Sequence, residues 1–160
     1  MMLRVSMMLI LGLLISSPMN LWAEHEQKNI DEIMSARQKE IDSAFSDFSR
    51  TKAVPKLAEI EKLNEDAGGS LIDWLDSAHL PCCIDKNSDF KRTWEEDQNK
   101  FKFYLKSICK NYTRIAGYYA ESSVPQKARS IYQYVTEAFD DSEFDKCIGE
   151  AKAGLEGLRK

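Results

Sequence analysis

Glycine and histidine are scarce in this chain, since seven glycines and two histidines occur among its 160 residues. Few glycines, together with apolar residues that recur three or four positions apart rather than alternating, predict an all-α fold. General acid–base catalysis needs a positioned and environmentally tuned group, and neither His25 nor His79 has an obvious partner in the sequence. We therefore expect no catalytic residues and a protein that is not an enzyme.

Motifs for metal and redox chemistry are also missing. A thiol oxidoreductase would have a Cys-x-x-Cys pair, and the four cysteines contain none. They also lack the short paired spacings of a zinc site. The segment Gly68-Gly69-Ser70 lacks the rest of a phosphate-binding loop and is typical of a helix stop followed by a helix cap. The sequence thus predicts no bound metal and no cofactor.

Residues 1–23 have the order of a secretory signal peptide. Arg4 precedes an apolar run that extends from Val5 to Ile15, and a polar stretch with Pro18 follows. The run is shorter than the roughly 20 apolar residues that a membrane-spanning helix needs. We expect cleavage after Ala23 and no stable membrane insertion, with an uncleaved anchor as the alternative. The predicted location is periplasmic in a Gram-negative source, or secreted.

The remaining residues, 24–160, are long enough for a single helical domain with its own core. They carry 21 basic and 26 acidic side chains, a formal net charge of −5, which argues against general affinity for nucleic acid or anionic lipid. The aromatic residues Phe101, Phe103 and Tyr104 lie among lysines, but in an exported acidic protein they fit a core better than a nucleic-acid surface. We expect partners that are proteins or peptides.

Three helices are predicted in the first half of this domain. Residues 27–49 place their apolar side chains on one stripe, and residues 55–67 form a second helix that the glycine pair ends. Ser70 then caps a third helix, residues 70–80, because Asp73 lies three positions on, as in a capping box.

Three more helices are predicted in the second half, giving a six-helix bundle. Residues 82–92 are polar and predicted to be irregular, and a long helix then runs from its cap Thr93 to about residue 120. A fifth helix covers residues 125–139 with Ser123 as its cap, and a sixth begins after Ser142.

Residues 109–142 carry a set of apolar spacings found in one helical repeat family. These are Tyr112, Ile115 with Ala116, Tyr119, Ala128 and Tyr132. With them the segment resembles a single tetratricopeptide repeat, although Val135 and Asp140 stand where a small residue and proline are usual. The resemblance implies protein or peptide binding on a concave helical surface, and no catalytic residues. An ordinary helical hairpin is the alternative.

Four cysteines, Cys82, Cys83, Cys109 and Cys147, are an even number in a chain predicted to reach an oxidising compartment, so we expect two disulfides. Adjacent cysteines rarely bond to each other. In the repeat-like geometry Cys109 and Cys147 lie on neighbouring helices, and we favour Cys82 and Cys83 tying to both. A direct Cys109–Cys147 bond, or thiols that are free or intermolecular, are the alternatives.

A basic stripe, Lys102, Lys106, Lys110 and Arg114, recurs every four residues along the long helix. It fits a solvated helix face, a contact strip for an acidic partner, or internal pairing with acidic residues of 140–145. Together these features predict an exported, non-catalytic helical module that binds a protein or peptide, such as an immunity or adaptor protein. The alternative is a structural or assembly component of the cell envelope or of a secretion apparatus.

Overall fold

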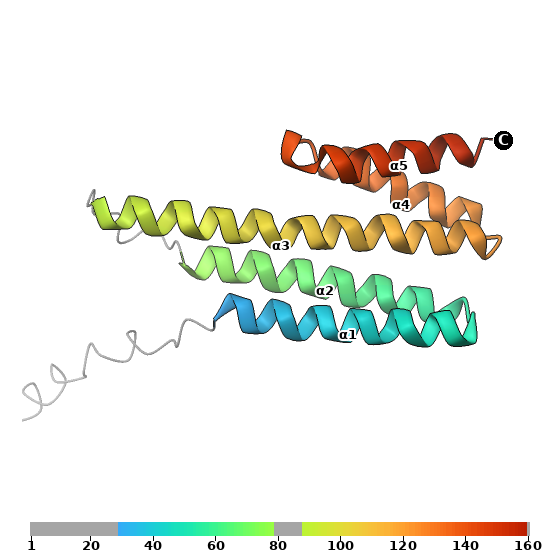
Figure 1. Ribbon diagram of the computed structural model, residues 1–160, viewed down its shortest axis with the longest axis horizontal. Helices are drawn as coiled ribbons and strands as arrows, with labels where there is room; N and C mark the ends of the chain where they lie inside the picture. The colour runs from blue at the N-terminus through green and yellow to red at the C-terminus, as the bar shows by residue number, and fades with distance from the viewer. Residues whose placement is uncertain (1–28, 79–87, 160) are drawn as a thin grey trace, which may run out of the picture.

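The computed structural model describes residues 29–78 and 88–159, and within these ranges every regular element is helical. The elements in chain order are α1 (Ile30–Thr51), α2 (Pro55–Ala78), α3 (Ser88–Glu121), α4 (Pro125–Ala138), the short 3-10 helix η2 (Ser142–Phe144) and α5 (Asp145–Gly157) (Figure 1). The predicted all-α fold is therefore confirmed. Among these helices, none has both the length and the apolar content that a membrane crossing requires. The predicted signal segment, residues 1–23, lies outside the described ranges.

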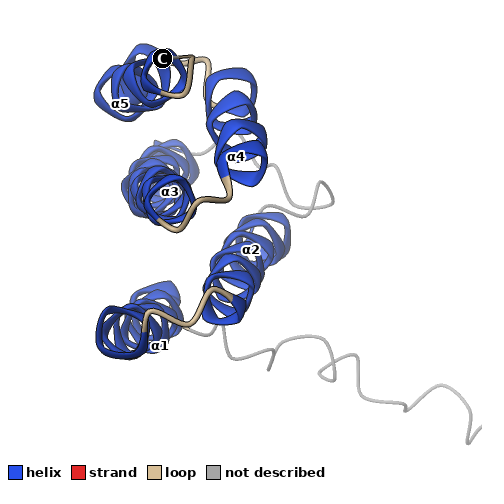
Figure 2. Cartoon of the chain, turned by 90° about the vertical axis from the view of Figure 1, so that its right-hand side faces the viewer, coloured by secondary structure: helices blue, strands red, loops and turns tan. Residues whose placement is uncertain are grey.

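The helices form two layers. Figure 2 shows α1, α3 and α5 side by side in one layer, with α2 and α4 in the other. Each helix packs against the next one along the chain, and α3 also packs against α5 within its own layer. The chain thus alternates between the layers, and α3, the longest helix, contacts both halves of the molecule.

One correction concerns the number of helices: the described residues form five α-helices, not six. The two helices predicted on either side of Gly68-Gly69 are a single helix, α2, and no described glycine has a positive φ angle. The Ser70 hydroxyl donates a hydrogen bond to the carbonyl oxygen of Asp66, over 2.9 Å, within the helix rather than capping a new one. The glycine pair is accommodated because apolar residues on both sides of it, Ala67 and Leu71, are buried.

The predicted helix starts are also corrected. At the N-terminus of α1, Asn29 is the cap, since its side chain accepts from the backbone N–H of Asp31. The start of α3 at Ser88 places Thr93 inside the helix and makes residues 88–92 helical; residues 82–87 lie outside the described ranges. Val124, not Ser123, occupies the cap position of α4 and makes no side-chain capping bond.

The last helix does not begin directly after Ser142. The 3-10 helix η2 precedes it, and the side chain of Asp141 caps η2 by accepting from the backbone N–H of Glu143 over 3.2 Å. The cap therefore lies one residue before Ser142, and α5 itself begins at Asp145.

A continuous hydrophobic core lies between the layers. Phe45 and Phe48 of α1, Leu57 and Ile60 of α2, and Ile115 of α3 are almost completely buried. The repeat-like positions in residues 109–142 are buried as well, and their side chains lie where α3 meets α4. The apolar stripes read from the sequence therefore face the core, as helical periodicity requires.

Candidate partner-binding clefts

A groove runs between α1 and α3 on the outer side of the three-helix layer. Side chains of α1 and α3 form its walls, Ala67 of α2 contributes to its lining, and it encloses about 310 Å³. Met34, Ile41 and Ile108 give it an apolar part, and Gln38 is among its polar residues. The groove forms because α1 and α3 both pack against α2 but make few direct contacts with each other.

An exposed aromatic side chain, Phe103, lines this groove. It is 64% exposed, and its ring stands edge-on to that of Tyr104 at a centroid distance of 5.1 Å. The prediction that Phe103 belongs to the core is therefore wrong. Phe101 and Tyr104, in contrast, are partly buried and pack against the core. Large exposed aromatics beside a concave surface are typical anchors of protein–protein interfaces.

Near Phe103, polar contacts hold Tyr104 against α1. The Tyr104 hydroxyl donates to Asp31 Oδ1 over 2.6 Å, and Lys100 Nζ lies 3.0 Å from the other carboxylate oxygen. The hydrogen bond from Tyr104 and then that from Lys100 lower the pKa of Asp31, while burial and Asp31 raise the pKa of Tyr104 to about 12. These contacts tie the N-terminus of α1 to α3.

Further along the groove, a chain of amide hydrogen bonds joins three helices. Asn111 Nδ2 of α3 donates to Gln38 Oε1 of α1 over 3.2 Å and to Asn64 Oδ1 of α2 over 3.0 Å. Asn64 is fully buried, and its own Nδ2 donates to the carbonyl oxygen of Ile108 over 3.1 Å. The two walls of the groove are thus joined to each other, and the α3 wall is also joined to α2 beneath it, so the groove is preformed.

The basic stripe does not form one surface. Lys102 and Lys106 bind the two carboxylate oxygens of Glu143, at 2.7 and 2.9 Å, and Lys102 also lies 3.8 Å from Asp141. Arg114 instead stacks its guanidinium over the ring of Phe45, 3.8 Å from the centroid. Four residues turn an α-helix by about 40° more than a full rotation, so the stripe drifts from the α5 side of α3 toward α1.

Internal pairing, one of the three interpretations of the stripe, therefore holds for Lys102 and Lys106. Lys110 is exposed between the two ends. The four side chains share no common face on which a single partner could contact all of them.

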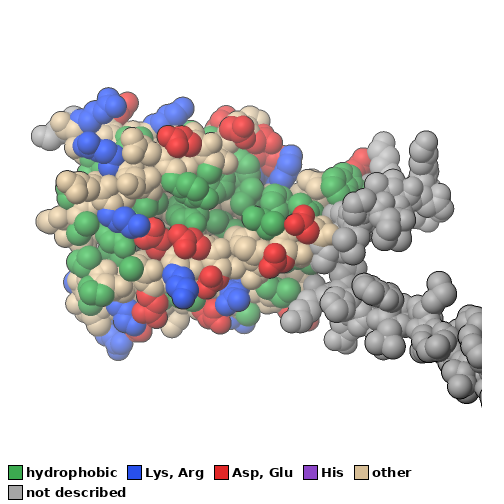
Figure 3. Space-filling model, turned by 180° about the vertical axis from the view of Figure 1, so that it is seen from behind, with side chains coloured by type: hydrophobic (Ala, Val, Ile, Leu, Met, Phe, Trp, Pro, Cys, Tyr) green, Lys and Arg blue, Asp and Glu red, His purple; other side chains and the backbone are tan. Residues whose placement is uncertain are grey.

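A second cleft lies on the opposite face, between α2 and α4. It encloses about 410 Å³ and is lined by Glu61 and Glu65 of α2, Tyr112 of α3, and Lys127, Ser130, Ile131 and Tyr134 of α4. Figure 3 views this side of the molecule and shows hydrophobic side chains gathered in a band, with acidic and basic groups around it. This cleft was not predicted from the sequence, because α2 and α4 are not neighbours in the chain.

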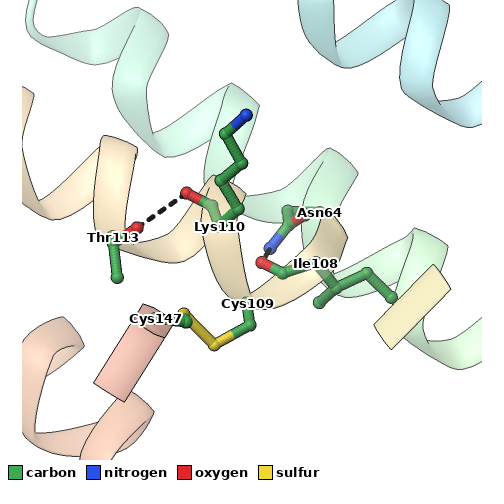
Figure 4. Close-up of a disulfide and its surroundings, with 6 residues drawn as sticks. All are labelled: Asn64, Ile108, Cys109, Lys110, Thr113 and Cys147. Atoms are coloured by element: carbon green, nitrogen blue, oxygen red, sulfur yellow. Dashed lines mark hydrogen bonds between the residues drawn. A yellow bond between two sulfur atoms is a disulfide. The ribbon is translucent and has the colours of Figure 1, made fainter. Parts of the chain in front are cut away.

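The disulfide differs from the favoured prediction. Cys109 of α3 bonds directly to Cys147 of α5, with a Cα–Cα distance of 6.3 Å (Figure 4). The two helices are neighbours in one layer, and this distance lies within the range that a disulfide spans. Cross-tying of Cys109 and Cys147 to Cys82 and Cys83 is therefore wrong; the latter two residues lie outside the described ranges.

Residues 29–78 and 88–159 contain no group of three His, Cys, Asp or Glu side chains placed to hold a metal ion. Both histidines considered in the sequence, His25 and His79, lie outside these ranges. The chain matches no protein-family model, no curated protein and no solved structure to which it was compared. The two clefts are the features of the described residues that bear on function.

Proposed function

We propose that this protein is an exported, non-catalytic helical module that binds a protein or peptide in the α1–α3 groove. The observation that carries the proposal is Phe103, a large aromatic side chain that is 64% exposed beside a preformed concave surface. Met34, Ile41 and Ile108 give the groove an apolar surface for a partner's side chains, and its lining also includes the charged residues Arg37, Lys39 and Asp42, which suit polar contacts.

The layered arrangement supports this proposal. A two-layer array of antiparallel helices exposes one continuous face made by every second helix, here α1, α3 and α5 (Figure 2). The tetratricopeptide-like spacings in residues 109–142 point to the same use of a helical surface. An immunity or adaptor role at the cell envelope is the finer form of the proposal.

Export is supported by two independent features. Residues 1–23 have the composition and order of a signal peptide. The Cys109–Cys147 bond is of a kind that persists in oxidising compartments such as the periplasm. Fractionation of the source cells tests this part: the mature protein should be found outside the cytoplasm, with its N-terminus near Glu24.

The binding site is tested by affinity capture with matched variants. Phe103→Ala removes the exposed ring from the groove, and Ile72→Ala removes a comparably exposed side chain, 54% accessible, from α2 outside the groove. We expect wild type and Ile72→Ala to retain the same partner from the source envelope. Phe103→Ala should bind this partner more than tenfold more weakly, because central aromatic anchors contribute about 2 kcal/mol or more to binding.

Equal capture by both variants would refute the groove as the site. Light scattering on the same samples addresses the alternative function. Self-association that Phe103→Ala abolishes, with no heterologous partner, would instead favour a structural or assembly component.

A further inference from the structure

The α2–α4 cleft is bordered by the most acidic helix of the described chain. Residues 55–78, which form α2, contain six acidic and two basic side chains, a net charge of −4. Two of the acidic residues, Glu61 and Glu65, lie one helical turn apart and both line the cleft. The electrostatic potential at this cleft therefore favours a cationic group.

Two tyrosines give the cleft an aromatic wall. The rings of Tyr112 and Tyr134 meet edge to face, with centroids 5.1 Å apart, and Tyr134 is 48% exposed while Tyr112 is buried. Burial, followed by the nearby Tyr134, Glu65 and Glu61, raises the pKa of Tyr112, so its phenol remains neutral. An exposed, electron-rich ring face next to carboxylates is the arrangement that binds cations in proteins.

The chain itself already places one cation here. Lys127 Nζ lies 2.7 Å from Glu61 Oε1, and only 15% of the Glu61 side chain is exposed. After the effect of burial, the charge of Glu61 and then a hydrogen bond to it raise the pKa of the Tyr119 phenol. With Glu61 engaged in this way, the exposed Glu65 leaves the lining with a net charge of −1.

We propose that the α2–α4 cleft binds an arginine side chain from a basic segment of the protein partner. A guanidinium group fits better than an ammonium group, because it is planar, stacks on an aromatic ring and forms two parallel hydrogen bonds with one carboxylate. Tyr134 supplies the ring and Glu65 the carboxylate. The inference rests on the proposed function only in that a protein supplies the arginine; the cleft is separate from the α1–α3 groove.

Titration with blocked tripeptides, followed by the amide and tyrosine signals in NMR spectra, tests the cleft without the partner. A tripeptide with a central arginine should shift signals of Tyr134, Glu65 and Lys127. The same tripeptide with glutamine should cause no such shifts, and the one with lysine should bind several-fold more weakly. Equal binding of the glutamine and arginine peptides, or stronger binding of the lysine peptide, would overturn the proposal.

Two variants locate the bound cation. Glu65→Gln should weaken binding of the arginine tripeptide at least fivefold, and Glu150→Gln, the same charge change on an exposed residue of α5, less than twofold. Tyr134→Leu, which keeps an apolar side chain but removes the ring, should weaken binding by a similar factor to Glu65→Gln. If neither cleft variant differs from Glu150→Gln, the site is wrong.

Failure of this inference is distinguishable from failure of the proposed function. Phe103→Ala should leave tripeptide binding unchanged, because Phe103 lies in the other cleft. Capture of the partner by Glu65→Gln should fall if the arginine belongs to that partner. If the wild-type protein binds the arginine tripeptide but Glu65→Gln captures the partner as well as wild type does, the partner does not supply the arginine.

Discussion

Gly154 of α5 lies so close to the ring of Tyr132 of α4 that a Cβ atom at this position would overlap the ring carbons. Tyr132 is itself buried between α3, α4 and α5, so it has little room to move. Gly154→Ala should therefore lower the free energy of unfolding by about 1–3 kcal/mol through overpacking. Gly149→Ala is the control, because nothing lies within 4 Å of a Cβ there. In denaturant unfolding it should be neutral or stabilising by up to about 1 kcal/mol.

The continuity of α2 predicts an unusual gain of stability at Gly69. A Cβ at this position would meet nothing within 4 Å, and the backbone is helical. Gly69→Ala should therefore raise the free energy of unfolding by about 0.5–1 kcal/mol, since alanine has the higher helix propensity. If the glycine pair were instead a helix stop with a positive φ angle, the same substitution would be destabilising. Thermal unfolding of the variant distinguishes the two structures.

The sequence predicted the helical class and the buried faces but not the continuity of α2. Periodicity reports which side of a helix is apolar, and this information is local. Whether two glycines end a helix depends on what the flanking turns bury. Here Ala67 and Leu71 pack in the same core, so the cost of about 1 kcal/mol per glycine is outweighed by burial.

The grooves were not predictable from single-helix patterns, because they are made by helices that are not consecutive. The orientation of Phe103 illustrates this. Neighbouring residues on a helix point about 100° apart, so Phe103 and Tyr104 cannot both face α1. Tyr104 is turned inward by its hydrogen bond to Asp31, 73 residues away in sequence, and Phe103 is left exposed.

One position in the sequence does indicate the polar link between the helices at the groove. Asn64 lies on the apolar stripe of α2, between Ile60 and Ala67, where an unpaired amide would be costly to bury. Such a position predicts a polar partner on another helix. That partner is Asn111, which also occurs on the buried side of its helix.

The Cys109–Cys147 bond should account for a large part of the stability. It closes a loop with a sequence separation of 38 residues, for which the chain-entropy model gives about 4 kcal/mol. The double variant Cys109→Ala/Cys147→Ala should lose unfolding free energy of this order. Tryptic digestion without reductant should yield residues 107–110 linked to residues 147–152. Recovery of either peptide linked to the one that contains Cys82 and Cys83 would contradict the structure.

The buried amide pair should show strong coupling. Asn64→Leu leaves a buried donor of Asn111 without its acceptor and should cost about 1–3 kcal/mol. Asn111→Leu similarly removes the donor to Asn64. In a double-mutant cycle the loss of unfolding free energy in the double variant should be smaller than the sum of the two single losses. The reason is that each single variant leaves one buried amide without its partner, whereas the double variant removes both amides. Strict additivity would show that the two side chains do not interact.

Alkaline pH should destabilise the fold through Tyr104. Its pKa is raised to about 12, above the value of about 10 for an unfolded chain. Because the folded state holds the proton more tightly, the stabilisation is complete below about pH 10 and is lost as the pH rises through about 12. Tyr104→Phe should therefore make the fall in unfolding free energy across this range shallower than in wild type.

The ultraviolet absorbance of the phenolates checks the same assignment. Arg114 lowers the pKa of Tyr118, chiefly through a hydrogen bond, whereas burial raises those of Tyr119 and Tyr132. In the native protein Tyr118 should thus ionise before Tyr104, and Tyr104→Phe should remove amplitude only from the late part of the titration. Loss of early amplitude would mean that the Tyr104 hydroxyl is not held by Asp31, and that this end of the α1–α3 groove is open.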